Sequence, residues 1–243
     1  AFNLAERLQT PVFVMLDLDI GMNLSLVAPF RMPEKPMDRG KVMGYDALES
    51  GVDFGRYRDV DGDGIPYRTY PGVHPTRGSF FTRGTSRDEY ARYTEESAPY
   101  QANMQRLLKK FDTARSHVPA PEIRKARQPA RRGVLYYGST TAAMDEAVAT
   151  LAQDGIPIDE CRIRAFPFAD SVVEFINAHD EVFIVEQNRD AQLRTLLMVE
   201  HGLNPAKLTP ILHYDGSPIT ARFIVSAIAA RVRPAAAKEK VAS

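Results

Sequence analysis

Polar side chains that could bind a ligand follow the most apolar stretch near the start of the sequence. Asp17, Asp19 and Asn23 come directly after the apolar residues 11–16, with Met22 between them. Two carboxylates and an amide at the carboxyl end of a buried strand can form the rim of a pocket. The same side chains can also do no more than cap the next segment.

A second polar group follows another apolar run, residues 181–185. Glu186, Gln187 and Asn188 would lie at the carboxyl edge of a parallel sheet, where ligands of open α/β sheets bind. On chemistry alone we favour a role in capping the next helix or in contacting a neighbouring subunit.

Arginine is concentrated in residues 77–89, where Arg77, Arg83 and Arg87 are interspersed with aromatic and acidic side chains. The planar guanidinium is a natural bidentate partner of a carboxylate, so this loop could bind an organic acid. A solvated surface loop is an equally good interpretation of the pattern alone.

Residues 59–64 match the first half of an EF-hand calcium loop, with Asp59, Asp61 and Asp63 at alternate positions. The match fails further on, because Tyr70 stands where calcium needs a bidentate glutamate and Pro66 falls in the coordinating half. We therefore expect an acidic surface turn that needs no metal.

Two further features favour structural interpretations. Residues 138–141 lie where a predicted strand meets a helix, a position that can hold phosphate, but they lack the lysine of a P-loop and a helix cap is favoured. Cys161 falls in a predicted strand and is expected to be an inert core residue. The five histidines show no metal-ligand spacing.

Composition limits the class of protein. The 243 residues carry 31 basic and 31 acidic side chains, so no overall charge favours nucleic acid or an anionic membrane. Asp17 and Asp19 interrupt the most apolar stretch, residues 11–30, which argues against a membrane span there. A single cysteine cannot hold an iron–sulfur cluster, and the composition suits a cytoplasmic protein.

The elements that must position these residues begin with an incomplete domain over residues 1–118. Residues 11–16 are apolar on both faces and predict a strand in the middle of a parallel sheet, yet residues 18–95 supply no partner strands. We therefore expect the N-terminal part of this domain to be missing from the chain. A helix is predicted from about residue 99 to about residue 118 by its apolar period.

The second part alternates regularly between strands and helices. Residues 119–132 contain three prolines and five basic residues and are expected to form a linker. Four strand–helix pairs over residues 133–232 predict a small parallel sheet with helices on both faces, and residues 233–243 are expected to be a frayed tail. The predicted fold class is therefore α/β.

Four stretches together resemble the alpha subunit of 2-oxoacid:ferredoxin oxidoreductases. Residues 5–23 are similar to the end of its domain that binds the pyrimidine of thiamine diphosphate, and residues 64–72 and 82–90 are similar to the loop region that follows. Residues 185–193 resemble the signature of its next domain, which has the transketolase C-terminal fold. The order and spacing of these stretches extend the resemblance over nearly the whole chain.

The resemblance implies oxidative decarboxylation of a 2-oxoacid with coenzyme A to an acyl-CoA, with release of CO₂ and reduction of ferredoxin. It implies a beta subunit as partner, which holds the diphosphate of thiamine diphosphate, Mg²⁺ and an iron–sulfur cluster, so this chain alone is expected to be inactive. Asp17, Asp19, Met22 and Asn23 would lie near the pyrimidine half of the cofactor.

Within the resemblance, Thr82, Arg83 and Gly84 are most similar to the 2-oxoglutarate branch. This makes Arg83 and Arg31 candidates for binding the second carboxylate of 2-oxoglutarate. The histidine of the family's common Gly-x-Glu-His-x-Glu pattern is absent from residues 84–89, so no catalytic residue is assigned to this loop. The second domain would pack against the partner subunit.

Two other classes of function remain open. A non-catalytic α/β interaction domain would need the predicted first strand to be covered within this chain. A component of a thiamine enzyme of the transketolase or dehydrogenase-E1 type would share the second fold while using another acceptor.

Overall fold

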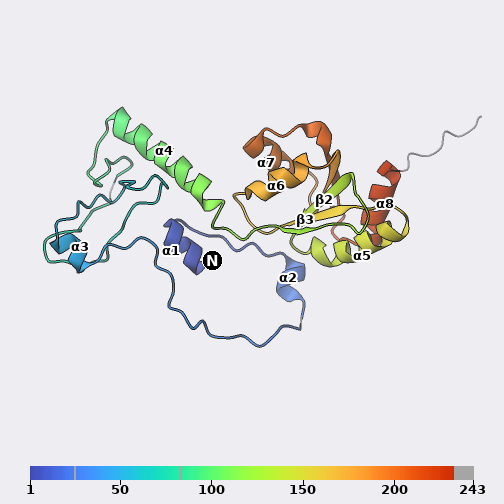
Figure 1. The fold of residues 1–243 in the computed structure, drawn as a ribbon, viewed down its shortest axis with the longest axis horizontal. Coiled ribbons are helices and arrows are strands. Elements are labelled where there is room, and N and C mark those ends of the chain that lie inside the picture. Colours follow the sequence, from blue (N-terminus) through green and yellow to red (C-terminus); the bar gives the residue numbers. More distant parts are fainter. Residues whose placement is uncertain (25, 83, 233–243) are drawn as a thin grey trace, which may run out of the picture. The chain divides into compact units, whose positions relative to one another are not determined.

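The computed structural model describes residues 1–24, 26–82 and 84–232, and the chain divides into two compact units (Figure 1). Unit 1 comprises Ala1–Met15 and Val27–Val118, and unit 2 comprises Leu16–Leu26 and the chain from Pro119 onward. None of the helices among the described residues is long and apolar enough to cross a membrane.

Unit 2 is built on a five-stranded sheet with the strand order β1-β3-β2-β4-β5. The strands are β1 Glu122–Arg124, β2 Arg132–Tyr137, β3 Asp159–Ile163, β4 Glu181–Glu186 and β5 Leu208–Leu212. β1 pairs antiparallel with β3 at one edge, and the other pairs are parallel. The chain passes from β2 to β3 on one side and then crosses to β4 on the other side of β2, so the strand order reverses between β2 and β4. The predicted α/β class with a parallel sheet is confirmed.

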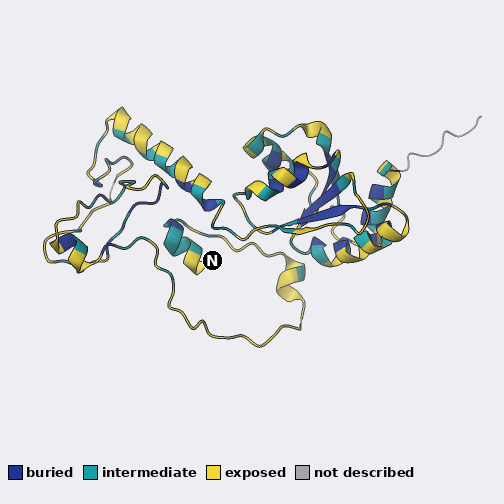
Figure 2. Cartoon of the chain, viewed as in Figure 1, coloured by how far each residue is buried: buried dark blue, intermediate teal, exposed yellow. Residues whose placement is uncertain are grey.

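Four helices cover the two faces of this sheet (Figure 1). They are α5 Thr140–Gln153, α6 Asp170–Asn177, α7 Gln192–His201 and α8 Ala221–Val232, with a short 3-10 helix at Pro205–Lys207 before β5. Successive side chains of a strand point to opposite faces. Val134 and Tyr136 therefore pack with α5 and α8, whereas Leu135 packs with α6 and α7. Burial on both faces, dark blue in Figure 2, explains why the central strands are continuous apolar runs.

Unit 1 consists mainly of loops, with three helices among its described residues. Its helices are α1 Phe2–Leu8, α3 Tyr45–Glu49 and α4 Ser97–Ala114, while α2 Leu18–Met22 belongs to unit 2. The apolar cluster of unit 1 among the described residues is small, and consists of Leu8, Ile65 and Ala114 with Leu4 packed against it. Polar contacts between loops must therefore contribute much of the cohesion of this unit.

The expectation of a buried strand over residues 11–16 is wrong for this structure. These residues form no strand, and the exposed fraction is 82% for Phe13 and 84% for Met15. A strand needs a neighbour for its backbone hydrogen bonds and a layer to cover its faces. The described part of the chain supplies neither for this segment.

Residues 119–132, which were expected to form a linker, contain the strand β1. Ile123 is paired with Cys161 of β3, and the Asp159 carboxylate accepts hydrogen bonds from the Ala126 N–H at 2.8 Å and from Lys125 Nζ at 2.7 Å. This segment is therefore tied to the sheet of unit 2 and does not run free over its surface.

Asp159 gives a prediction about the stability of unit 2. Burial alone would raise the pKa of its carboxyl, but hydrogen bonds from Lys125, the Ala126 N–H and His179 lower the pKa below its usual range. A carboxylate with a lowered pKa stabilises the fold above its unfolded pKa of about 3.9, and this contribution is lost as the pH falls through the lowered folded pKa. Asp159→Asn should therefore lower the free energy of unfolding at pH 7 by about 2–4 kcal/mol, because it breaks a buried network.

Urea unfolding of the variant between pH 7 and the acid range measures both effects. The loss of stability in acid should be smaller in Asp159→Asn than in the wild type. Asp180→Asn, which removes an exposed carboxylate paired with Arg131, serves as the control and should change little. If Asp159→Asn lost as much stability in acid as the wild type does, the lowered pKa of Asp159 would not be the cause of that loss.

Candidate functional site

The candidate site lies at the carboxyl ends of β2 and β4, where the strand order of unit 2 reverses. In open α/β sheets this reversal forms the crevice in which ligands bind. β2 leads into Ser139 and Thr140 at the start of α5, and β4 leads into Gln187. Gln187 Nε2 donates hydrogen bonds to Ser139 Oγ at 3.0 Å and to Thr140 Oγ1 at 3.2 Å. The amide therefore bridges the two strand ends.

Asp17 reaches the same place from residues 16–26. Its carboxylate accepts a hydrogen bond from the Ser139 hydroxyl, and it also accepts the Ile20 N–H at 2.9 Å and so caps α2. The bond from Ser139 is the main reason that the pKa of Asp17 lies below its usual range. Gln187, Ser139 and Asp17 thus form a chain of hydrogen bonds, with the carboxylate beside the N-terminal end of α5, where backbone N–H groups favour negative charge.

The other residues predicted near Asp17 do not join this cluster. Asp19 and Met22 lie on α2, and 74% of Met22 is exposed. Asn23 ends the helix, with its N–H donating to the Asp19 carbonyl at 3.2 Å. Arg31 is exposed and forms no hydrogen bond or ion pair with any residue that the structure describes, and Arg83 lies outside the described residues.

Glu186 and Asn188 are used to begin α7. The fully buried Glu186 carboxylate accepts the Leu193 N–H at 2.7 Å and the Arg194 N–H at 3.0 Å, and Asn188 Nδ2 donates to it at 2.7 Å. A carboxylate at this place satisfies N–H groups that have no partner inside the helix. Of the three consecutive polar residues, Gln187 alone is hydrogen-bonded to Ser139.

Ser139 and Thr140 are the residues that sequence reasoning assigned to a helix cap. The Ser139 side chain makes no capping hydrogen bond and joins Asp17 to Gln187 instead. The signal that could have found this arrangement is positional, because Ser139 and Gln187 follow strands that are neighbours on opposite sides of the reversal.

Cys161 lies in the apolar core of unit 2. The side chain is fully buried in β3, and burial raises the pKa of its thiol to about 12. The geometry supports the expected role of an inert core residue.

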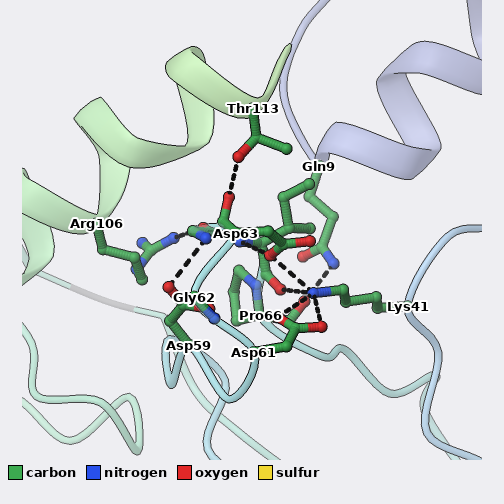
Figure 3. A network of polar contacts seen from close by, with 11 residues as sticks. Gln9, Lys41, Asp59, Asp61, Gly62, Asp63, Pro66, Arg106 and Thr113 are labelled. Carbon is green, nitrogen blue, oxygen red and sulfur yellow. Dashed lines mark hydrogen bonds and ion pairs between the residues drawn. The ribbon is translucent and has the colours of Figure 1, made fainter. Parts of the chain in front are cut away.

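Three carboxylates of unit 1 are close enough to suggest a metal site. Oxygen atoms of Asp59, Asp61 and Asp63 all lie within 4.8 Å of one another. Lys41 reaches into this cluster, as Figure 3 shows. Its Nζ lies 2.6 and 2.7 Å from the two oxygens of Asp61 and 2.7 Å from Asp63 Oδ1, and it donates to the Ile65 carbonyl at 3.0 Å. The ammonium group thus lies where a cation would be bound.

The third carboxylate, that of Asp59, binds backbone N–H groups of the same turn. Its two oxygens accept the Gly62 N–H at 3.0 Å and the Gly64 N–H at 2.9 Å, which closes the loop. Gly64 has a φ of +77° and lies against α4, where an added Cβ would be 2.4 Å from the Lys110 backbone nitrogen. Only glycine fits at this position.

A protein of known structure has the same fold as this chain. No protein-family model matches the chain. The 2-oxoglutarate:ferredoxin oxidoreductase from Magnetococcus marinus, solved with 2-oxoglutarate, coenzyme A and succinyl-CoA bound, matches with a TM-score of 0.79 and 20% identity over 95% of this chain and 39% of that one. The two proteins therefore share a fold over nearly the whole of this chain.

Curated relatives define the family more closely. The alpha subunit of 2-oxoacid:ferredoxin oxidoreductase 2 from Aeropyrum pernix is 28% identical over 234 residues, which cover 94% of this chain and 35% of the relative. The alpha subunit from Saccharolobus solfataricus is 24% identical over 229 residues, covering 90% of this chain and 34% of the relative. This chain is thus a relative of 2-oxoacid:ferredoxin oxidoreductase alpha subunits, as its motifs predict, and it spans about a third of their length.

Lys41 gives a prediction about the acidic turn. Burial alone would lower the pKa of Lys41, but hydrogen bonds to Asp61 and Asp63 raise it above its usual range, so the ammonium stays charged in the cluster. Lys41→Met should lower the free energy of unfolding by about 1–3 kcal/mol, because it leaves two carboxylates without their shared partner. Lys35→Met, which removes an exposed lysine, is the control.

Thermal unfolding with calcium or with a chelator tests the same loop. The melting temperature of the wild type should be unaffected by either, because the ammonium lies where the cation would bind and Tyr70 replaces the carboxylate of the twelfth position. The double variant Asp61→Asn, Asp63→Asn should also be insensitive to calcium. A calcium-dependent rise in the wild type that disappears in the double variant would overturn this view.

Proposed function

We propose that this chain is part of the alpha subunit of a cytoplasmic 2-oxoacid:ferredoxin oxidoreductase that acts on 2-oxoglutarate. The similarity to alpha subunits over 90–94% of the chain supports the family of the enzyme. The substrate is supported by the resemblance of residues 82–84 to the 2-oxoglutarate branch and by the ligands bound in the Magnetococcus marinus enzyme. The proposed reaction is oxidative decarboxylation to an acyl-CoA, with release of CO₂ and reduction of ferredoxin.

The observation in this structure that supports a place in a larger alpha subunit is an exposed apolar segment between residues 13 and 32. Leu24 and Leu26 are fully exposed, and 96% of Phe30 and 90% of Met32 are accessible. Contiguous exposed apolar side chains mark interaction surfaces in soluble proteins. We assign this segment to contact with the remaining part of a full-length alpha subunit, about two thirds of which has no counterpart in this chain.

The role proposed for this chain is to position groups around a cofactor that a beta subunit helps to hold. Thiamine diphosphate, when bound, supplies the nucleophilic carbon and the electron sink for decarboxylation. Asp17, Asp19, Met22 and Asn23 would lie near its pyrimidine half, and the bond between Asp17 and Ser139 would fix where this segment lies on unit 2. We place Mg²⁺ and the iron–sulfur cluster on the beta subunit, as the resemblance implies, and this chain has a single cysteine.

The test is an assay of the full-length alpha subunit with and without its beta subunit. Ferredoxin reduction with 2-oxoglutarate and coenzyme A should require both subunits, and the 243-residue chain alone should show none. Turnover by this chain alone would contradict the proposal, and so would failure of the complete complex to oxidise any 2-oxoacid.

The substrate is tested in the same complex with Arg83→Met. Loss of a desolvated bidentate contact should lower kcat/KM for 2-oxoglutarate by about a hundredfold, while pyruvate and 2-oxobutyrate are affected little. Arg31→Met is the matched variant, and it becomes the next candidate if Arg83→Met has no effect. Equal losses of kcat/KM for monocarboxylic and dicarboxylic substrates would show that Arg83 stabilises the structure and does not bind the second carboxylate.

A further inference from the structure

Unit 1 contains three cationic side chains that no carboxylate neutralises directly. Arg56, Arg106 and Lys110 form no ion pair with any residue in the part of the chain that the structure describes. Burial lowers the pKa of all three, and repulsion from neighbouring cations lowers it further for Arg56 and Lys110. Burying positive charge without a counter-ion is costly, so this cluster favours the approach of an anion.

The three cations are held in place by groups that do not cancel their charge. The guanidinium carbon of Arg56 lies 5.3 Å from the centre of the Tyr57 ring, and that of Arg106 lies 5.5 Å from the same ring. Lys110, one turn further along α4, is 7% exposed and donates to the Gln9 carbonyl at 3.3 Å. Ring and carbonyl contacts orient a cation but leave its full charge.

The acidic group that attracts Arg106 already accepts other hydrogen bonds. Asp59 attracts Arg106 electrostatically, but its two carboxylate oxygens accept the backbone N–H groups of Gly62 and Gly64. Arg106 itself donates to the Gly64 carbonyl at 3.0 Å and to Asn103 Oδ1 at 3.4 Å. A guanidinium has five N–H donors, so these two bonds fix its orientation and leave others available.

A cavity of about 210 Å³ opens beside Arg106, between α4 and the loop that carries Ser86. Tyr57, Tyr100 and Asn103 also line it. The Ser86 hydroxyl is buried and has no hydrogen-bond partner among the described residues. A buried hydroxyl without a partner is unfavourable and needs an explanation, and here it lies in the lining of a cavity that Arg106, a half-buried arginine, also lines.

We propose that this cavity binds a small oxyanion, the phosphate or carboxylate group of a small molecule. Arg106 and Ser86 would donate hydrogen bonds to the anion, and Arg56 and Lys110 would add positive charge behind them. Charge-assisted hydrogen bonds from a guanidinium suit both anions in geometry. The cavity is smaller than a site for a drug-sized ligand, which favours a single anionic group. The inference concerns unit 1 and does not depend on the proposed reaction.

Titration calorimetry of the 243-residue chain tests the proposal. Inorganic phosphate and acetate are titrated separately at constant ionic strength, and the anion that binds more tightly identifies the class of group. Saturable binding with one site per chain is expected for at least one of them. Absence of saturable binding by both anions would overturn the proposal, and it would leave the proposed enzyme function unaffected.

Three variants separate a specific site from general attraction. Ser86→Ala removes a hydroxyl that has no partner, so it should leave the melting temperature unchanged while weakening anion binding about tenfold. Arg106→Gln should abolish binding. Lys109→Gln removes one charge from an exposed position of the same helix and should leave binding within about twofold of the wild type. Equal weakening in Ser86→Ala and Lys109→Gln, or no weakening in Ser86→Ala, would contradict the site.

Discussion

A strand of a parallel sheet must have neighbouring strands at its sides and cover on both faces, and the apolar stretches of this chain differ in whether they meet that requirement. The strands in the sheet of unit 2 meet it, since α5 and α8 cover one face of the sheet and α6 and α7 cover the other. The apolar segment between residues 13 and 32 does not meet it within the described chain. This difference distinguishes a sheet that is covered on both faces from an exposed apolar segment, and the proposed contact of that segment with the rest of an alpha subunit rests on it.

Two positions that would suit bound ions are taken by the chain's own charged side chains. The Asp17 carboxylate lies beside the start of α5 at the reversal of the strand order, where anions bind in open sheets. The Lys41 ammonium lies among the oxygens of Asp61 and Asp63 and of a backbone carbonyl. In both cases a charged side chain joins segments that are distant in sequence, Asp17 through the Ser139 hydroxyl and Lys41 through the Asp61 and Asp63 carboxylates. In unit 1 this matters most, because its apolar cluster is small.

The sequence patterns predicted unit 2 well and unit 1 poorly, for reasons that individual residues show. Strands such as β4 and β5 and helices such as α5 follow from strong local periods, and β4 Glu181–Glu186 differs by one residue from the apolar run 181–185. β1 was missed because three residues beside prolines carry almost no pattern, and its pairing with β3 is a tertiary effect. Residues 11–16 have the composition of a buried strand, but composition cannot say whether a neighbouring strand is present.

The candidate site shows the same limit. Asp17 and Gln187 were both singled out by their places after apolar runs, yet nothing local indicates that Ser139 joins them, because the three residues come from three separate segments. Likewise Lys41 precedes the acidic turn by 18 residues or more, and no spacing rule predicts that its ammonium reaches into the turn. Capping by Glu186 could be predicted because donor and acceptor are close in sequence.

The central claim is that the apolar segment between residues 13 and 32 is a surface for the rest of an alpha subunit, and amide hydrogen exchange tests it most directly. Exchange in these residues is compared between this chain alone and the full-length alpha subunit in complex with its beta subunit. We expect fast exchange in the chain alone and protection of roughly a hundredfold or more in the complex, because burial and pairing slow local opening. Equally fast exchange in both would contradict the claim and leave this segment without a partner.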